Sequence, residues 1–333
     1  MLDVLIIGAG PAGLAAAIAA KTRGLSYVVL EKGGLVNSLQ RYPVDMVFFT
    51  TPELLEIGGL PFVSPHDKPT RQEALRYYRR VTDFFGLDIR FDETVTRVER
   101  LDDGGFSVTA QPRHGAPIAR QAQAVVVASG AYDMPNRIGV PGEDLPHVSH
   151  YYREPHGYYR KRVVVVGGKN SAADVALELY RVGAEVVLVY RGERLSDSIK
   201  YWVKPDIENR IKEGSIQARF RTHITEITLD EVRVSGPDGL AVERADAVLL
   251  MTGYASDTTV LRGAGAAIDD RIGAPIYDAD TLETNVPNLF VIGAAVAGQQ
   301  SGHIFIENGR FHGDVVIRSI AERLQARSTS TQG

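Results

Sequence analysis

The sequence predicts an α/β fold, because a hydrophobic strand, a glycine-rich turn and a helix follow one another twice along the chain. The first unit is Val4 to Ile7 followed by the turn Gly8 to Gly13, and the second is Val163 to Val166 followed by Gly167 to Ala172. Each helix leads into another apolar strand, as in the βαβ units of parallel sheets. The length of 333 residues exceeds what one core usually organises, so two domains are expected.

The first half of the chain shows the elements of such a domain in order. Its first helix is expected from about Ala12 to Arg23, with Gly24 as its stop, and the next strand from Tyr27 to Leu30. A later helix, Thr70 to Phe85, has a capping threonine at its start and Gly86 after it. Two alternating strands and one buried strand complete this half: Thr94 to Arg100, Phe106 to Ala110, and Val125 to Ala128.

The second half repeats this order after Pro141 to Arg162, a segment rich in Pro, Gly, His and Tyr that we interpret as a linker. The expected elements are Ser171 to Val182, Glu185 to Tyr190, Pro205 to Glu213, Ile224 to Leu229, Glu231 to Ser235, Val248 to Met251, Leu289 to Ile292 and Phe305 to Leu324. A return crossing is expected near Pro275. The prediction is two Rossmann-like domains of three-layer ββα architecture, with residues 146–276 inserted into a discontinuous domain of residues 1–145 and 277–333.

The composition excludes several classes of function. The 37 basic and 41 acidic residues leave a formal net charge of −4, and no basic block suggests a nucleic-acid partner. No apolar run approaches the ~18 residues of a membrane helix, and no signal peptide is evident, so a cytoplasmic protein is expected. The cysteine count is zero, which excludes disulfides, thiolate metal sites and an internal dithiol relay.

The first glycine turn predicts an FAD site. Its glycines allow a tight turn and close approach of a pyrophosphate, and the following helix N-terminus favours negative charge. Glu31 stands 23 residues after Gly8, at the end of the next strand, where a carboxylate can accept a hydrogen bond from a ribose hydroxyl. An acid at this place suits the unphosphorylated ribose of FAD.

The second turn predicts an NADPH site. Arg191 takes the place of the acid, 24 residues after Gly167, and Arg194 and Lys200 follow closely. A cationic group here suits a 2′-phosphate, although Arg191 could instead be a solvated charge beside Glu193. The turn is less regular than the first, because Lys169 occupies the middle glycine position, and a purely structural turn is the alternative.

The region Gly293 to Phe305 is expected to hold the flavin ring. A helix beginning near Gly302 would direct its positive end at the ring carbonyl beside N1, and the alternative is an ordinary glycine-rich loop. Three histidines between His147 and His156 lack metal-ligand spacing, so no metal site is predicted. His150 and Tyr151 are candidates for a catalytic proton donor.

With these motifs in place, the chain resembles the thioredoxin reductase-like flavoproteins, and within them the bacillithiol disulfide reductase (YpdA-type) family. The resemblance lies in five stretches: Lys68 to Arg71, Gly167 to Ala172, Ser198 to Val203, Glu283 to Val286, and Ile304 to Gly313. It implies a homodimeric, NADPH-dependent FAD oxidoreductase of the bacterial cytosol, whose domains rotate to bring nicotinamide to flavin. By family, the electron acceptor is a low-molecular-weight disulfide.

Turn chemistry and resemblance together predict two sets of binding residues. The FAD set is Gly8, Gly10, Pro11, Ala12, Gly13, Glu31, Lys32, Gly34, Tyr42, Val95, Ala128, Gly130, Gly293, Ala294, His303 and Ile304. The NADPH set is Gly167, Gly168, Asn170, Ser171, Ala172, Arg191, Arg194, Lys200 and Gly253.

Two departures from the resemblance bear on mechanism. Thioredoxin reductases carry a C-x-x-C pair where this chain has Val148 to Tyr151, and the bacillithiol branch typically has a cysteine where Ala12 stands. Disulfide reduction here would therefore proceed without a protein thiol. Three alternatives stay open: a ferredoxin or flavodoxin NADP reductase or diaphorase, a flavin monooxygenase suggested by Val140 to Gly142 before His147, and a non-catalytic redox sensor.

Overall fold

The computed structural model describes residues 1–330, and the side chains of residues 300, 301 and 327–330 lie outside this description. The α/β prediction is confirmed, and the chain divides into two compact units. The first unit comprises residues 1–134 together with the described residues from 254 onward, and the second comprises residues 135–253.

The sheet of the first unit combines a parallel half and an antiparallel half. Its strands, in spatial order, are β3 (Ile89–Arg90), β2 (Tyr27–Leu30), β1 (Leu2–Ile7), β6 (Ile118–Val127), β5 (Phe106–Pro112) and β4 (Glu93–Arg100), and β19 (Leu289–Val291) also pairs with β6. The strands β2, β1, β6 and β19 run parallel, whereas β4, β5 and β6 form an antiparallel meander. The carboxyl ends of β1, β2, β6 and β19 therefore meet at one edge.

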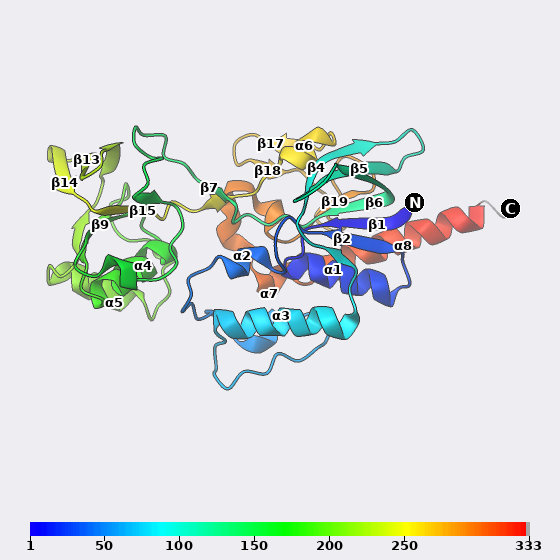
Figure 1. Ribbon diagram of the computed structural model, residues 1–333, viewed down its shortest axis with the longest axis horizontal. Helices are drawn as coiled ribbons and strands as arrows, with labels where there is room; N and C mark the ends of the chain where they lie inside the picture. Colours follow the sequence, from blue (N-terminus) through cyan, green and yellow to red (C-terminus); the bar gives the residue numbers. More distant parts are fainter. Residues whose placement is uncertain (331–333) are drawn as a thin grey trace. The chain divides into compact units, whose positions relative to one another are not determined.

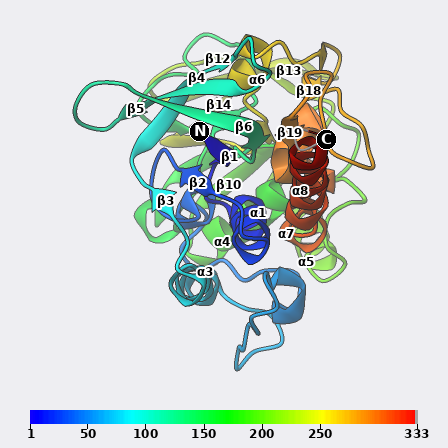
Figure 2. The ribbon, with the colours of Figure 1, turned by 90° about the vertical axis from the view of Figure 1, so that its right-hand side faces the viewer.

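Three layers follow from the alternation of side chains along β1. Val4 and Ile6 pack against the helices α1 (Pro11–Thr22), α3 (Arg71–Phe85) and α8 (His312–Ser330), while Leu5 and Ile7 pack against β4, β5 and α6 (Thr259–Gly263). Figures 1 and 2 show α1, α3 and α8 on one face of this sheet and β4 with α6 on the other. Short elements complete the unit: α2 (Asn37–Gln40), η1 (Pro52–Leu55), β17 (Ile268–Asp269), β18 (Ala274–Pro275), η3 (Gly293–His303) and α7 (Ile306–Gly309).

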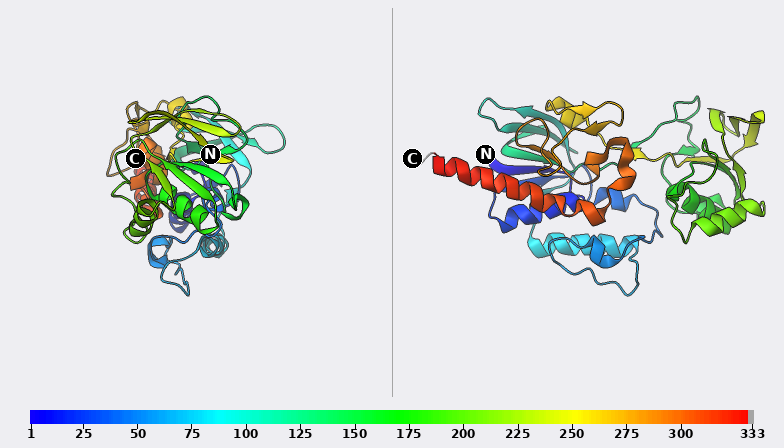
Figure 3. Two further views of the ribbon diagram at one scale, coloured as in Figure 1. Left: turned by 90° about the vertical axis from the view of Figure 1, so that its left-hand side faces the viewer. Right: turned by 180° about the vertical axis from the view of Figure 1, so that it is seen from behind.

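The second unit repeats the three layers. Its parallel sheet has the order β11 (Gln217–Arg219), β10 (Glu185–Val189), β9 (Arg162–Val166), β15 (Ala247–Leu250) and β8 (Val148–Ser149). Val163 and Val165 face α4 (Asn170–Arg181) and α5 (Lys204–Lys212), which lie together on one side (Figure 3), and Val164 faces the antiparallel sheet β12 (His223–Ile227), β13 (Glu231–Gly236) and β14 (Gly239–Arg244). A short turn, η2 (His156–Tyr158), precedes β9.

The crossings between the units fall earlier in the chain than predicted. The boundaries expected at residues 145 and 276 lie instead after Met134 and Gly253, where β7 (Met134–Pro135) pairs with β16 (Tyr254–Ala255). The supposed linker belongs to the second unit, because Val140 and Leu145 pack into its core and the Ile227 N–H donates to the Pro141 carbonyl at 2.9 Å. Residues 254–276 belong to the first unit, because Leu261 and Ala266 are buried in its core.

The predicted C-terminal helix is divided. Instead of one helix from Phe305 to Leu324, α7 ends at Gly309 and α8 runs from His312 to Ser330. Arg310 lies at this break, and its Nη1 donates to the carbonyls of Glu53 at 2.7 Å and Glu56 at 2.8 Å. The helix expected to begin near Gly302 is also wrong, since residues 293–303 form the 3₁₀ segment η3.

Candidate functional site

The first glycine turn leaves one side open and fills the other. Gly8 has φ +106°, and a Cβ on it would lie 2.5 Å from the Ala128 carbonyl oxygen. A Cβ on Gly13 would lie 2.0 Å from the Gly8 oxygen, whereas a Cβ on Gly10 would meet no atom within 4 Å. Gly10 is the N-cap of α1, and the helix has no side-chain cap and no acid in its first turn. The open side therefore presents backbone N–H groups of a helix N-terminus, as a pyrophosphate requires.

Glu31 is buried at the end of β2, beside this turn. Its Oε2 accepts the Ala9 N–H at 2.7 Å and its Oε1 accepts the Gly33 N–H at 2.9 Å. Burial raises the pKa of the Glu31 carboxyl, and these two N–H groups oppose the rise. Each carboxylate oxygen keeps a further lone pair, so the fixed side chain can also accept ribose hydroxyls.

Ser129 is a further candidate site residue, which the sequence alone did not indicate. It follows β6, at the strand end next to β1, and its buried Oγ has no hydrogen-bond partner among the residues that the structure describes. Buried hydroxyls are rarely left without a partner, so this oxygen fits a bound polar ligand beside the turn. Its neighbours Ala128 and Gly130 belong to the predicted FAD set. Ser129 itself is indicated only by its missing hydrogen-bond partner, which the sequence does not show.

Lys32 and Tyr42 lie in one cluster around Asp133. The Lys32 Nζ is 2.8 Å from an Asp133 oxygen, and Arg41 pairs with the other oxygen. The Tyr42 ring contacts Tyr132 edge-on at 4.8 Å, and burial raises the pKa of Tyr42 to about 12. Two members of the predicted FAD set are thus held by the chain that follows Gly130.

Other members of the FAD set lie at the end of β19. Gly293 has φ +62°, and a Cβ on it would lie 2.8 Å from the Ala12 Cβ, so the strand end touches the first turn of α1. The Gly293 N–H donates to His312 Nδ1 at 3.1 Å, which requires that nitrogen to be unprotonated, and burial lowers the pKa of His312. His312 lies in the stretch Ile304 to Gly313, but the sequence alone predicts no role for it. The Ala294 carbonyl accepts the Ser256 hydroxyl at 2.9 Å.

Four predicted FAD residues have no contact with the first glycine turn that the structure makes plain. Val95 lies on β4 and packs into the core between the sheet layers. His303 and Ile304 lie at the end of η3, where the His303 carbonyl accepts the Asn308 Nδ2 at 3.0 Å. A Cβ on Gly34 would lie 3.2 Å from the Gln40 side chain. Their roles stay predictions.

The second glycine turn has the same design in the second unit. Gly167 has φ +146°, and a Cβ on it would lie 2.6 Å from the Met251 carbonyl oxygen. A Cβ on Gly168 would lie 2.3 Å from the Tyr190 ring. The helix α4 begins here with Lys169 as its N-cap, and it has no capping side chain and no acid in its first turn. Asn170, Ser171 and Ala172 form that first turn, as predicted.

The predicted cations follow β10, and their surroundings differ. Arg191 is exposed and forms no ion pair within the described part of the chain. Arg194 pairs with Asp197 at 2.6 Å, and the Lys200 Nζ lies 3.1 Å from Asp174. Gly253 has φ +87° and ends the second unit, where its carbonyl accepts the Asn136 N–H at 2.9 Å.

His150 and Tyr151 both lie in the second unit. His150 Nε2 is 3.1 Å from the buried Glu143 carboxylate, and burial lowers the pKa of His150. Glu143 also accepts the N–H groups of Ile138 and Gly139, so it anchors the loop after β7. A proton-donor role for His150 or Tyr151 stays a prediction. Within the described residues, no group of three potential metal ligands is found.

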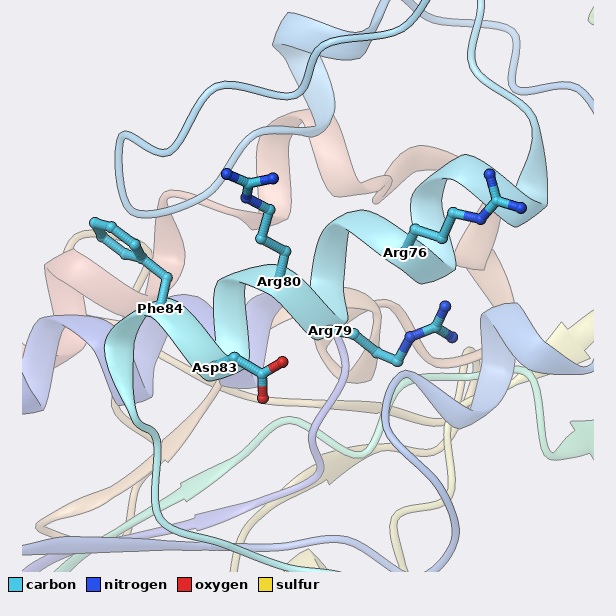
Figure 4. A pocket seen from close by; sticks show the side chains of 5 residues that line it. All are labelled: Arg76, Arg79, Arg80, Asp83 and Phe84. Carbon is cyan, nitrogen blue, oxygen red and sulfur yellow. The ribbon is translucent and has the colours of Figure 1, made fainter.

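An open hollow of about 530 Å³ lies elsewhere, on the outer face of α3. Figure 4 shows its lining residues on that helix: Arg76, Arg79, Arg80, Asp83 and Phe84. None of them belongs to either predicted set. The hollow is therefore not part of the candidate nucleotide sites.

Known proteins share this arrangement over nearly the whole chain. Residues 5–293 match the family described as Pyridine nucleotide-disulphide oxidoreductase. "Bacilliredoxin reductase Bdr" of Bacillus subtilis is 42% identical over 321 residues, which are 96% of this chain and 97% of the relative. Among solved structures, "Bacillithiol Disulfide Reductase Bdr (YpdA)" from Bacillus cereus has a TM-score of 0.94 at 42% identity, covering 97% of this chain and 99% of that one. The Staphylococcus aureus protein of the same title has a TM-score of 0.91 at 36% identity, covering 97% and 98%.

These likenesses agree with the two glycine turns and the buried Glu31 described above. Among the described helices, none is long and apolar enough to cross a membrane. The residues around Gly10, with an open helix N-terminus and the partnerless Ser129 hydroxyl, fit an FAD pyrophosphate. The chain belongs to the pyridine nucleotide-disulphide oxidoreductase family and is an NAD(P)H-dependent flavoprotein oxidoreductase that uses FAD and NADPH.

Proposed function

We propose that this protein uses NADPH to reduce a low-molecular-weight disulfide of the bacillithiol type. The observation that carries the proposal is the 42% identity to a bacilliredoxin reductase across 96% of the chain. The overall reaction converts NADPH, one proton and one disulfide into NADP⁺ and two thiols. FAD, when bound, supplies the two-electron relay between coenzyme and acceptor.

The chain's own residues bind and orient the two nucleotides. Glu31 would hold the FAD ribose, and Gly8, Gly10 and Ala12 its pyrophosphate at the N-terminus of α1. Arg191 and Arg194 would bind the 2′-phosphate of NADPH, and the chain at Gly302 to Ile304 would lie against the flavin ring.

The absence of cysteine makes this activity unusual in one respect. A total of zero cysteines leaves no protein sulfur to form a mixed disulfide with the substrate. Ala12 lies in the first turn of α1, at the position where the family resembled typically has a cysteine. FAD, when bound, would therefore supply both electrons to the substrate disulfide without a protein thiol as intermediate.

A reoxidation experiment tests the proposal. The protein would be reduced anaerobically with NADPH and mixed in a stopped-flow instrument with bacillithiol disulfide, flavodoxin, a quinone or oxygen. We expect the disulfide to restore the oxidised flavin spectrum fastest, with two thiols formed per NADPH. If flavodoxin or oxygen reoxidised the flavin faster, the carrier-reductase or oxygenase alternative would replace this proposal. No reoxidation by any acceptor would leave only the sensor role.

We further infer a homodimer in the bacterial cytoplasm, as the family resemblance implies. Three exposed apolar side chains of the first unit support it: Leu54 on η1, and Phe305 and Phe311 on either side of α7, an element that contacts η1. Arg310 ties the two elements together through the Glu53 and Glu56 carbonyls. Exposed apolar groups on neighbouring elements are typical of interfaces. Light scattering should give twice the chain mass of 36.3 kDa, and Phe311→Asp should shift it toward the single chain mass.

A further inference from the structure

Three hydrogen bonds fix the loop before α5 to the second glycine turn. The Ser196 N–H donates to the Gly168 carbonyl at 2.9 Å. The Asn170 carboxamide donates to the Ser198 carbonyl at 3.0 Å and accepts the Lys200 N–H at 3.0 Å. These bonds fall on both sides of the residue between Ser196 and Ser198. Its backbone is therefore held beside the N-terminus of α4.

That residue is Asp197, and its carboxylate bridges two cations. Arg194 donates to both oxygens, at 2.8 Å from Nη1 and 2.6 Å from Nη2, and Lys204 Nζ donates to Oδ1 at 2.6 Å. The hydrogen bonds from Lys204 and then Arg194 lower the pKa of Asp197 to about 2. Asp197 is thus a permanent anion at neutral pH.

A carboxylate held by a guanidinium fork and an ammonium group resembles a bound phosphate. Two adjacent N–H donors of Arg194 contact two oxygens, which is also how arginine contacts a phosphate ester. Arg191, by contrast, has no acidic partner within the described chain. Of the two arginines assigned to the coenzyme, one is available and the other is already occupied by an internal acid.

We propose that Asp197 occupies the place of the coenzyme's 2′-phosphate when NADPH is absent, and thereby limits how strongly this enzyme prefers NADPH to NADH. The inference rests on the proposed assignment of this loop to NADPH. A 2′-phosphate that reaches Arg194 must displace the Asp197 carboxylate. Because the backbone of residue 197 is fixed by its neighbours, the displaced charge stays near the dianion.

Both effects weaken NADPH and leave NADH unaffected, because NADH carries no 2′-phosphate. Because Asp197 is exposed, water screens its charge, and two unit charges about 4 Å apart in water change affinity by about fivefold for each pair. A phosphate carries nearly two charges, so two such repulsions multiply to about 25-fold at this distance. Salt screening and a somewhat greater separation reduce this effect, so removal of Asp197 should strengthen NADP⁺ binding by about tenfold.

The test is a binding titration of the oxidised, FAD-loaded protein with NADP⁺ and with NAD⁺, followed by the flavin absorbance or by calorimetry. Asp197→Asn keeps the shape of the side chain and removes its charge, and the side chain is exposed, so the core is untouched. We expect the Kd of NADP⁺ to fall about tenfold and that of NAD⁺ to stay constant. Asp206→Asn is the matched control, since Asp206 pairs with Arg181 on the same unit and lies on α5.

Further variants separate the possible failures. The gain from Asp197→Asn should be smaller in an Arg194→Ala background, because competition for that guanidinium is lost and only the direct repulsion of the phosphate remains. Equal tightening of NAD⁺, or an equal effect of Asp206→Asn, would overturn the inference. So would an unchanged or weaker Kd of NADP⁺ in Asp197→Asn. Arg191→Ala tests the underlying site: if it weakens NADP⁺ selectively, the site stands whatever Asp197 does, and if it affects both coenzymes equally, the proposed NADPH site itself is wrong.

Discussion

Replacing Gly10 with alanine is expected to weaken FAD binding by about 10- to 100-fold while the apoprotein keeps its fold. Gly10 has φ −76° and ψ 174°, which alanine adopts without strain, and an added Cβ would meet no protein atom within 4 Å. The space that this Cβ would enter is the space into which the pyrophosphate must approach the backbone. Overpacking of this kind costs about 1–3 kcal/mol, and the stated range in affinity corresponds to about 1.4–2.7 kcal/mol, which lies within it.

The matched control is Gly263→Ala. Gly263 ends α6, has no positive φ, and an added Cβ there would also meet no atom within 4 Å. Both variants should unfold in urea like the parent apoprotein, and only Gly10→Ala should lose FAD in a fluorescence titration. Full FAD affinity in Gly10→Ala would show that the pyrophosphate lies elsewhere than at this turn.

Replacing Ala12 with cysteine is expected to accelerate disulfide reduction by about tenfold or more, equal to a barrier lower by ~1.4 kcal/mol. Ala12 is the second residue of α1, in an N-terminal turn without acidic residues. A helix N-terminus lowers the pKa of a thiol and favours the thiolate, which can attack a substrate sulfur and form a mixed disulfide. The thiolate would open the substrate disulfide to give a mixed disulfide and one free thiol. FAD, when bound and reduced by NADPH, would supply the two electrons that release the second thiol and restore the cysteine.

Ala12→Ser is the control for this variant, because it adds a side-chain atom of similar size but no sulfur nucleophile. The measurement is NADPH consumption with bacillithiol disulfide and, separately, with a quinone, at equal FAD content. Only the disulfide rate of Ala12→Cys should rise. An increase with the quinone as well, or in Ala12→Ser, would contradict a thiol-based gain and point to a change in flavin access.

The sequence predicted the local features best. The helix expected from Thr70 to Phe85 is α3, and its capping box is complete: the Glu73 N–H donates to the Thr70 hydroxyl at 3.2 Å, and the Thr70 N–H donates to Glu73 at 2.8 Å. Gly86 follows with φ +54°. These signals are local, since a cap and a left-handed stop depend on residues within one turn.

The unit boundaries needed the tertiary structure. The composition of Pro141 to Arg162 predicted a linker, but Leu145 is partly buried against strands distant in the sequence, and Leu261 is buried in the core of the first unit. The break at Arg310 is similar, because its cause is a pair of carbonyls more than 250 positions earlier in the chain. The sequence around Arg310 gives no sign of these distant carbonyl partners.

By itself, the sequence determined the α/β class, the two glycine turns, and the charged residues Glu31 and Arg191 that follow them. These features depend on residues that are close together in the chain. Only the tertiary structure decided that the Ser129 hydroxyl lacks a partner, that His312 holds the Gly293 N–H, and that Arg194 is already occupied by Asp197. Each of these depends on which groups meet after folding. Hydrogen bonds and ion pairs act over a few ångströms in space, whatever the separation along the chain.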